Sequence, residues 1–363
     1  MTHTQRLMAI KEGKSTDRPA FAVWGPHMNL IDRNAGDLAK ATIDYQFAAD
    51  CGFIKVMPNG MYFTEAFGQK MRPAEHLLDE MWLNVTVNAI NDPHEWLKIK
   101  VPSMKEGPLA REIEAVKRIC DYYQDDVPVL PTVFSPFIWM GEMTGGYFRQ
   151  EVIIGHFTYS EKEAASGLEV VAETNELLME EYIKAGAAGF FLGYQCGMAA
   201  KMGKDMFEEY GKKYDLRNLA SIQGKTRFNM AHVCHGDAEH FEWFLDYPVD
   251  AFNWADQEEG QYSMSEARKK TDKVLVGGLA HSLGGVVRGV DDIVKNRSDL
   301  SGYERDEIKA RIKEKALAAI KAAGPKVVIS GGCAWGPSAV PRFGLIKEVM
   351  EEIGNEESGY TGG

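Results

Sequence analysis

The stretch Ala-Gly-Ala-Ala-Gly-Phe-Phe-Leu at residues 185–192 joins an amphipathic segment to a short apolar run. Upstream, apolar side chains between residues 168 and 185 recur on one face at helical spacing. Ser160 and Glu163 form a capping-box pattern at the start of this segment, and Gly186 is placed to end it. The sequence therefore predicts a helix that leads directly into a buried strand, which is the repeating unit of an α/β fold.

Seven other apolar runs share the length and flanks of a buried parallel strand, and helical patterns lie between them. The eight predicted strands are Phe21–Trp24, Phe53–Met57, Val127–Phe134, Ala188–Leu192, Phe228–Val233, Ala251–Trp254, Val274–Val276 and Val327–Ile329. Eight strands that alternate with helices predict a (β/α)8 barrel. A doubly wound open sheet is the rival fold, but the sequence contains no glycine-rich phosphate loop after an early strand.

The predicted domain organisation is a single barrel over residues 1–355. The segment before Pro19 is expected to form a helix that covers the bottom of the barrel. Two further helices are predicted at Asp44–Asp50 and Arg311–Ala322. Residues 356–363 are expected to form a flexible tail.

Composition and charge exclude several classes of protein. The chain has 363 residues, of which 45% are hydrophobic and 26% charged, as in ordinary globular proteins. The net charge of −12 would repel a phosphate backbone, so nucleic acid is not expected as a partner. The sequence shows no apolar run of membrane-spanning length and no signal peptide, and five cysteines argue against a disulfide framework. We therefore expect a cytoplasmic protein with free thiols.

The strongest chemical pattern lies at the ends of two predicted strands. The fifth strand ends with His232 and Cys234, which are two residues apart and so point to the same side of the strand. Cys333 follows the eighth strand and would reach the same mouth of the barrel. One nitrogen and two sulfur ligands suit zinc, and three protein ligands leave the fourth position open for chemistry. The alternative is that these are ordinary buried core residues.

Other polar residues at strand ends are candidates for substrate binding or catalysis. They are Asn59, Tyr62, Tyr194, Gln195, His235, Asp256 and His281. Asp256 could hydrogen-bond a substrate or a histidine ligand, or it could simply cap a helix. His235 could be an extra ligand, an acid or base, or an exposed loop residue.

The pattern of His232, Cys234 and a late Cys333 resembles the His-x-Cys…Cys zinc motif of the cobalamin-dependent methyltransferases in the uroporphyrinogen decarboxylase superfamily. The likeness extends over residues 1–355. It includes Pro131-Thr-Val-Phe-Ser-Pro-Phe137, Ala185-Gly-Ala-Ala-Gly-Phe-Phe-Leu192, Asn253-Trp-Ala-Asp256 and Val276-Gly-Gly-Leu279. The superfamily fold is a (β/α)8 barrel, which agrees with the strand count.

The resemblance implies a zinc-dependent methyltransferase of a corrinoid methyl-transfer system. Zinc would activate a thiol or a methylated small molecule, which would exchange a methyl group with the corrinoid. The sequence carries no corrinoid-binding motif of the Asp-x-His-x-x-Gly type. The methylcobalamin-type corrinoid is therefore expected on a separate corrinoid protein that docks over the barrel mouth.

The sequence departs from the true porphyrinogen decarboxylases, which carry an arginine-rich loop after the first strand and an aspartate after the second. Here these places read Ala22-Val-Trp-Gly-Pro-His27 and Pro58-Asn59-Gly60. The methyltransferases usually have a glycine where this chain has His235.

Two alternatives remain. The first is a metal-independent decarboxylase or lyase of a small carboxylated substrate, for which Arg18, Arg72 and Arg149 are the early candidate cations. The second is a metal-binding protein without enzyme activity, in which all four zinc positions are filled.

Overall fold

The computed structural model describes residues 1–25, 32–73, 83–145, 150–280, 283–288, 302–335 and 342–358. Its strands are β1 (Ile54–Lys55), β2 (Lys70–Pro73), β3 (Leu83–Val87), β4 (Val129–Leu130), β5 (Thr132–Phe134), β6 (Phe191–Gln195), β7 (Met230–Cys234), β8 (Ala251–Asn253), β9 (Val274–Leu279) and β10 (Val327–Gly331).

The larger helices are α1 (His3–Lys11), α2 (Ala35–Ala49), α4 (Gly107–Tyr123), α5 (Pro136–Met143), α6 (Gln150–Tyr159), α7 (Glu161–Lys184), α8 (Cys196–Met202), α10 (Lys213–Ile222), α12 (Met264–Lys270), α14 (Arg305–Ala323) and α15 (Gly344–Ser358). The shorter ones are α3 (Tyr62–Glu65), η2 (Pro93–Leu97), α9 (Lys204–Met206), the π-helical η3 (Phe207–Lys212), α11 (Ala238–Phe241), η4 (Glu242–Phe244) and α13 (Leu283–Arg288).

The strands form a ring. β5 to β10 pair in parallel in chain order, and β1 pairs in parallel with β4. β4 and β5 are two parts of one predicted strand, interrupted at Pro131, which has no backbone N–H to donate. The segment around Phe21 closes the ring, because Ala22 N donates to Ile329 O at 2.9 Å and Gly52 N donates to Phe21 O at 2.6 Å. The predicted (β/α)8 fold is confirmed. Seven of the eight predicted strands are strands of these two sheets, and the first, Phe21–Trp24, is present only as an isolated bridge between Phe21 and Ile329.

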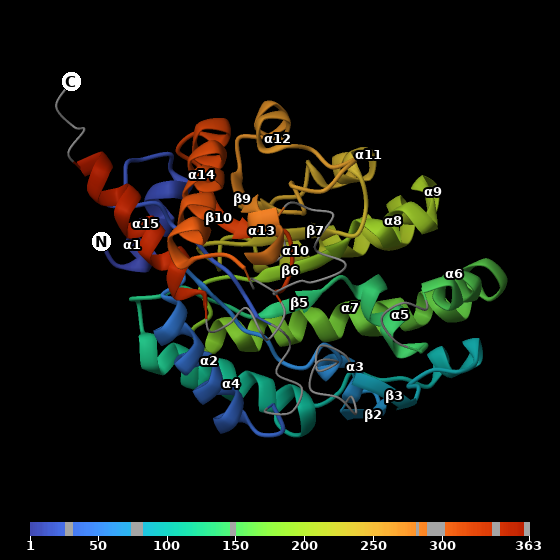
Figure 1. Ribbon diagram of the computed structural model, residues 1–363. Coiled ribbons are helices and arrows are strands. Elements are labelled where there is room, and N and C mark those ends of the chain that lie inside the picture. Colours follow the sequence, from blue (N-terminus) through green and yellow to red (C-terminus); the bar gives the residue numbers. More distant parts are fainter. Residues whose placement is uncertain are drawn as a thin grey trace.

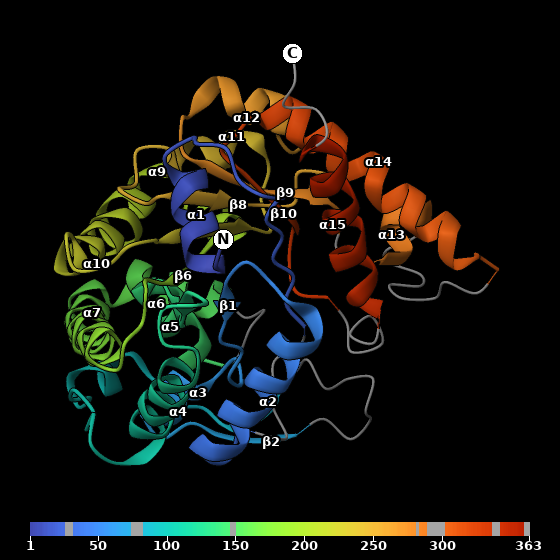
Figure 2. The same ribbon diagram turned by 90° about the vertical axis from the view of Figure 1, so that its left-hand side faces the viewer.

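Helices surround the ring, and Figure 2 looks along it with α1 in front of the strands. Figure 1 shows the same barrel from the side, with α7 along the lower strands and α14 and α15 together at one flank. The hairpin of β2 and β3, which the sequence analysis did not predict, is an antiparallel addition after α3. Among the described residues no helix is long and apolar enough to cross a lipid bilayer.

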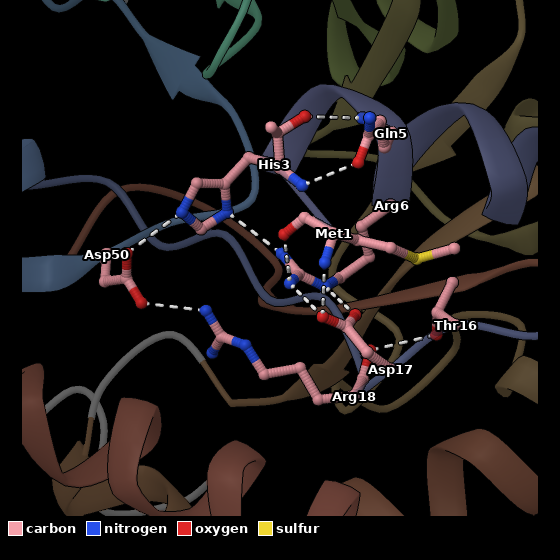
Figure 3. A network of polar contacts seen from close by, with 9 residues as sticks. Met1, His3, Gln5, Arg6, Thr16, Asp17, Arg18 and Asp50 are labelled. Atoms are coloured by element: carbon pink, nitrogen blue, oxygen red, sulfur yellow. Dashed lines mark hydrogen bonds and ion pairs between the residues drawn. The ribbon is translucent and has the colours of Figure 1, made fainter.

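Helix α1 covers the bottom of the barrel as predicted, held by the polar network of Figure 3. Arg6 donates to both carboxylate oxygens of Asp17, at 2.8 and 2.9 Å. His3 and Arg18 both contact the carboxylate of Asp50, at 2.9 and 2.8 Å. These contacts fix the N-terminal helix to the loop that enters the first strand and to the end of α2.

Some predicted boundaries differ from the structure. Helix α7 begins after Ser160 and ends before Gly186 as predicted, but the Ser160 side chain makes no capping hydrogen bond. Helix α2 begins at Ala35, nine residues before the predicted start at Asp44 (44 − 35). Helix α15 continues to Ser358, so the first three residues of the predicted tail are helical, and residues 359–363 lie outside the described part of the chain.

Strands β6 and β7 approach each other very closely where they begin. A Cβ atom placed on Gly189 would lie 1.8 Å from the backbone oxygen of Phe228. Any side chain at this position would therefore push the two strands apart, which explains the glycine in the stretch that indicates the fold.

A buried acidic cluster supports the loop that follows β1. Glu112 on α4 is 1% exposed and accepts a hydrogen bond from Arg111 Nε at 2.8 Å, and Arg111 also contacts Glu65 at 3.0 Å. Buried Asp32 is a further carboxyl group coupled to this cluster. Burial is the main cause that raises the pKa of Glu112 from 4.5 to about 8, Arg111 lowers it in part, and the charge of Asp32 adds to the rise.

This pKa predicts a pH dependence of stability. The folded pKa of Glu112 lies above its ordinary value, so its contribution is complete below about pH 4.5 and is lost as the pH rises towards 8. We expect Glu112→Gln to remove about 3 kcal/mol of the decrease in unfolding free energy between pH 5.5 and pH 8, measured by urea titration. The matched control is Glu114→Gln on the exposed side of the same helix. An identical pH slope in wild type and Glu112→Gln would contradict the assignment.

Candidate metal centre at the barrel mouth

His232 and Cys234 lie on the inner face of β7, near its carboxyl end. Both residues are buried, at 6% and 5% exposure. The His232 ring packs against Phe191 of β6, with ring centroids 5.0 Å apart, and edge-on against Trp24 at 6.3 Å. Cys234 is two residues further along the same strand, so its side chain leaves the strand on the same side.

Asn253 of β8 determines the orientation of the His232 ring. Its Nδ2 donates to two backbone oxygens, Val276 O at 2.8 Å and Gly331 O at 3.1 Å. The amide oxygen therefore faces His232 Nδ1, 2.5 Å away. Since an amide oxygen only accepts, Nδ1 carries the hydrogen and Nε2 keeps its lone pair.

The sequence analysis missed Asn253 as a member of the site, although the residue belongs to the quoted Asn-Trp-Ala-Asp stretch. Asn253 pairs directly with His232 in the strand register, which the structure shows and the sequence alone does not.

The lone pair of His232 Nε2 faces the thiol of Cys333. The two atoms are 3.9 Å apart, although 101 residues separate them in sequence. A nitrogen and a sulfur bound to one tetrahedral zinc stand roughly 3.5 Å apart, given bonds of about 2.0 and 2.3 Å. The structure thus brings together two of the three predicted ligands at nearly that spacing.

Within the described residues, no three His, Cys, Asp or Glu side chains already stand at metal-binding positions. The donor set nevertheless suits zinc in type, since it combines one imidazole with a preset tautomer and two thiols. A bound ion would require the Cys234 thiol to move towards His232 Nε2 and Cys333 Sγ.

Lys55 of β1 is a further residue of the site that sequence reasoning missed. Its Nζ lies 4.3 Å from the centroid of the Phe191 ring and 5.8 Å from that of Trp24. Burial lowers the pKa of Lys55 from 10.5 to about 7, while the charges of Cys333 and Cys234 act in the opposite direction. The signal in the sequence was a single lysine inside the apolar run Phe53–Met57.

Two predicted site residues, on the loop after β1 and at the start of α3, have structural contacts. Buried Asn59 donates from Nδ2 to Asp32 at 2.6 Å and accepts at Oδ1 from Met61 N at 2.9 Å. The Tyr62 hydroxyl is equally enclosed and donates to Thr132 O at 2.8 Å. The amide of Asn59 and the hydroxyl of Tyr62 thus hold the loop, and the structure does not bring either residue to His232.

Tyr194 and Asp256 also pack away from the ligand pair. Tyr194 is three residues after Phe191 on β6, so its side chain points to the opposite face of the strand. There it lies against Phe244 and Tyr247, outside the barrel. The Asp256 carboxylate accepts from Gly278 N at 2.9 Å, and burial raises its pKa to about 6.

The last three candidates are Gln195, His281 and His235, and only His235 has a described side chain. Gln195 is the last residue of β6, in register with Cys234, and its side chain is not described. His281 lies outside the described residues. His235 is exposed and has a φ of +61°, a left-handed conformation that costs a histidine about 1 kcal/mol relative to glycine. Its backbone oxygen would be 2.1 Å from a Cβ on Gly197, so α8 packs closely against it.

The chain resembles known proteins in both sequence and fold. The family model described as uroporphyrinogen decarboxylase (URO-D) matches residues 56–295, which is more than half of the chain. Among solved structures, the chain is similar to a methyltransferase from Methanosarcina mazei, with a TM-score of 0.74 and 16% identity, over 97% of this chain and 99% of that one.

A second similar structure is a B12-independent methionine synthase from Shewanella sp. W3-18-1 in complex with selenomethionine. Its TM-score is 0.56 at 12% identity, over 96% of this chain and 99% of that one. No curated protein sequence matches the chain. The similarity to these structures establishes the shared fold, and the family model establishes descent: the chain belongs to the uroporphyrinogen decarboxylase (URO-D) family.

Proposed function

We propose that this protein is a zinc-dependent methyltransferase of a corrinoid methyl-transfer system. The observation that carries the proposal is the pair of His232 Nε2 and Cys333 Sγ, 3.9 Å apart, with the histidine tautomer preset by Asn253. A buried imidazole with its lone pair aimed at a thiol is arranged to share a metal ion rather than to fill a core. The fold of the Methanosarcina mazei methyltransferase supports the same interpretation.

His232, Cys234 and Cys333 would hold the zinc ion at the open end of the barrel. When bound, zinc supplies Lewis acidity, which removes the proton from a coordinating thiol and keeps its sulfur nucleophilic at neutral pH. The chain contributes a fixed imidazole through Asn253, and it contributes apolar surroundings for that ring through Trp24 and Phe191.

The reaction that fits this site moves a methyl group between cobalt and sulfur. In one direction the substrate thiol loses its proton to solvent and its sulfur takes the methyl group from cobalt(III) of the corrinoid. The electron pair of the broken carbon–cobalt bond would stay with cobalt, which would become cobalt(I). In the reverse direction cobalt(I) would take the methyl group of a methylated small molecule and become methylcobalt(III), while the released heteroatom would keep the bonding electron pair and take a proton from solvent. The corrinoid would arrive on a separate protein that docks over the mouth, because the two reacting atoms must come within bonding range.

The alternative, a metal-independent decarboxylase or lyase, needs cations in the pocket for the substrate carboxylate. Arg18 does not supply one, because it contacts Asp50 in the polar network at the bottom of the barrel. Arg72 lies on the β2–β3 hairpin, and Arg149 is outside the described residues. Among the described residues, Lys55 is a cation that shares the Phe191 and Trp24 rings with His232, so the test of the proposal must separate metal-dependent from metal-free activity.

The zinc site predicts a stoichiometry. Wild-type protein purified without chelator should hold about one zinc ion per chain, and Cys333→Ala should lose the ion and the methyl-transfer activity while circular dichroism shows an intact barrel. The measurement is metal content by mass spectrometry, together with methylcobalamin consumption in the presence of a thiol. Cys120→Ala is the matched control, since this buried cysteine on α4 lies outside the site. Full zinc and activity in Cys333→Ala would refute the site.

The role of Asn253 gives a second prediction. Asn253→Ala removes the acceptor that holds His232 Nδ1, so zinc affinity should fall about 10–100-fold, measured by competition with a chromogenic chelator. The control is Asn218→Ala, which removes another buried amide, on α10. The Asn218→Ala variant should lose about as much stability as Asn253→Ala and keep the zinc affinity of the wild type. Equal zinc affinity in wild type and Asn253→Ala would show that the hydrogen bond does not orient a ligand.

A further inference from the structure

Lys55 is a cation in a place where the structure provides no carboxylate for it. It is a residue of β1, on a strand whose neighbours Ile54, Val56 and Met57 are buried. Among the described residues Lys55 makes no ion pair, and its ammonium group donates to the thioether sulfur of Met57. Lys55 itself is partly buried, and withdrawing an ammonium group even partly from water without an anion is unfavourable, so the position calls for an explanation.

Two aromatic rings contact both the Lys55 ammonium group and the His232 ring. Phe191 contacts the Lys55 Nζ and the His232 ring, at centroid distances of 4.3 and 5.0 Å. Trp24 likewise contacts both, at 5.8 and 6.3 Å. The amine and the imidazole therefore share the same two neighbours inside the barrel.

The charges of the proposed site identify the missing anion. Two cysteinates cancel the charge of a divalent ion, so the site with His232, Cys234 and Cys333 is neutral overall. A substrate sulfur that binds there after losing its proton adds one negative charge. In a pocket of low dielectric this charge is costly unless a cation lies close by.

We propose that Lys55 is a positioning residue that supplies the countercharge for the substrate sulfur at the metal centre. The inference rests on the proposed function and adds to it the group that sets the affinity for the thiol. A bound zinc ion would gain little from Lys55, because the ion and its two cysteinate ligands together would carry no net charge. Substrate affinity and metal affinity therefore respond differently to the loss of this charge.

The same charge has a second consequence. An ammonium group beside a sulfur stabilises the deprotonated form but reduces its reactivity towards a methyl group. Loss of Lys55 should therefore raise KM for the thiol without lowering kcat. A residue with a purely structural role would instead lower kcat or the amount of folded protein.

The experiment uses full-length protein in which cobalt(II) replaces zinc, with 2-mercaptoethanol as an uncharged thiol probe. Binding of the probe is followed by the sulfur-to-cobalt charge-transfer absorption. We expect Lys55→Met to bind cobalt normally and to weaken probe binding about tenfold, with Lys55→Arg close to wild type. The matched control is Lys273→Met, because Lys273 lies 6.0 Å over the Phe252 ring before β9, away from the mouth.

Each result decides the inference. Equal probe affinity in wild type and Lys55→Met, with cobalt bound in both, overturns the role of Lys55 and leaves the metal site intact. Loss of cobalt binding in Lys55→Met also overturns it, because the residue would then serve the ligands themselves. Failure of wild-type protein to bind cobalt or zinc overturns the proposed function, and the inference about Lys55 fails with it.

Discussion

The amide of Asn253 is the interaction on which the interior of the barrel depends. It bonds to His232 on β7, to Val276 O on β9 and to Gly331 O at the end of β10. One side chain thus ties four neighbouring strands together where the barrel opens. Because all of its donors and its acceptor are engaged, the amide cannot turn over without leaving buried polar groups unpaired. The tautomer of His232 is therefore a property of the barrel and not of the histidine alone.

Periodicity was sufficient to predict the barrel. Short apolar runs that alternate with amphipathic helices allow few folds. Seven of the eight runs form parallel strands, and the eighth joins them through an isolated bridge at Phe21. The hairpin of β2 and β3 could not be predicted in this way, since its strands pair with each other and carry no core pattern. The strand interrupted at Pro131 was predicted as one element, because the apolar pattern runs on through the proline whose missing backbone N–H divides it.

The site was predictable only in part, for a physical reason. The juxtaposition of His232 and Cys333 followed from a motif, combined with the rule that strand ends meet at the barrel mouth. The supporting polar residues did not follow, since a polar side chain at a strand end can face inward or hold a loop. Asn59 and Tyr62 hold loops, whereas Asn253 and Lys55 face inward. Only the strand register distinguishes these two cases, and register is not visible in a single sequence.

Trp24 links this architecture to an optical property. The chain has seven tryptophans, and the Trp24 indole lies 6.3 Å from the His232 ring, perpendicular to it. It is 3% exposed and also lies beneath the Lys55 ammonium. Indole emission changes in yield and colour with nearby charge, so the protein carries an intrinsic fluorophore at the mouth of its barrel. With the other six tryptophans replaced by phenylalanine, the remaining fluorescence would report events at the metal centre in real time, without a label.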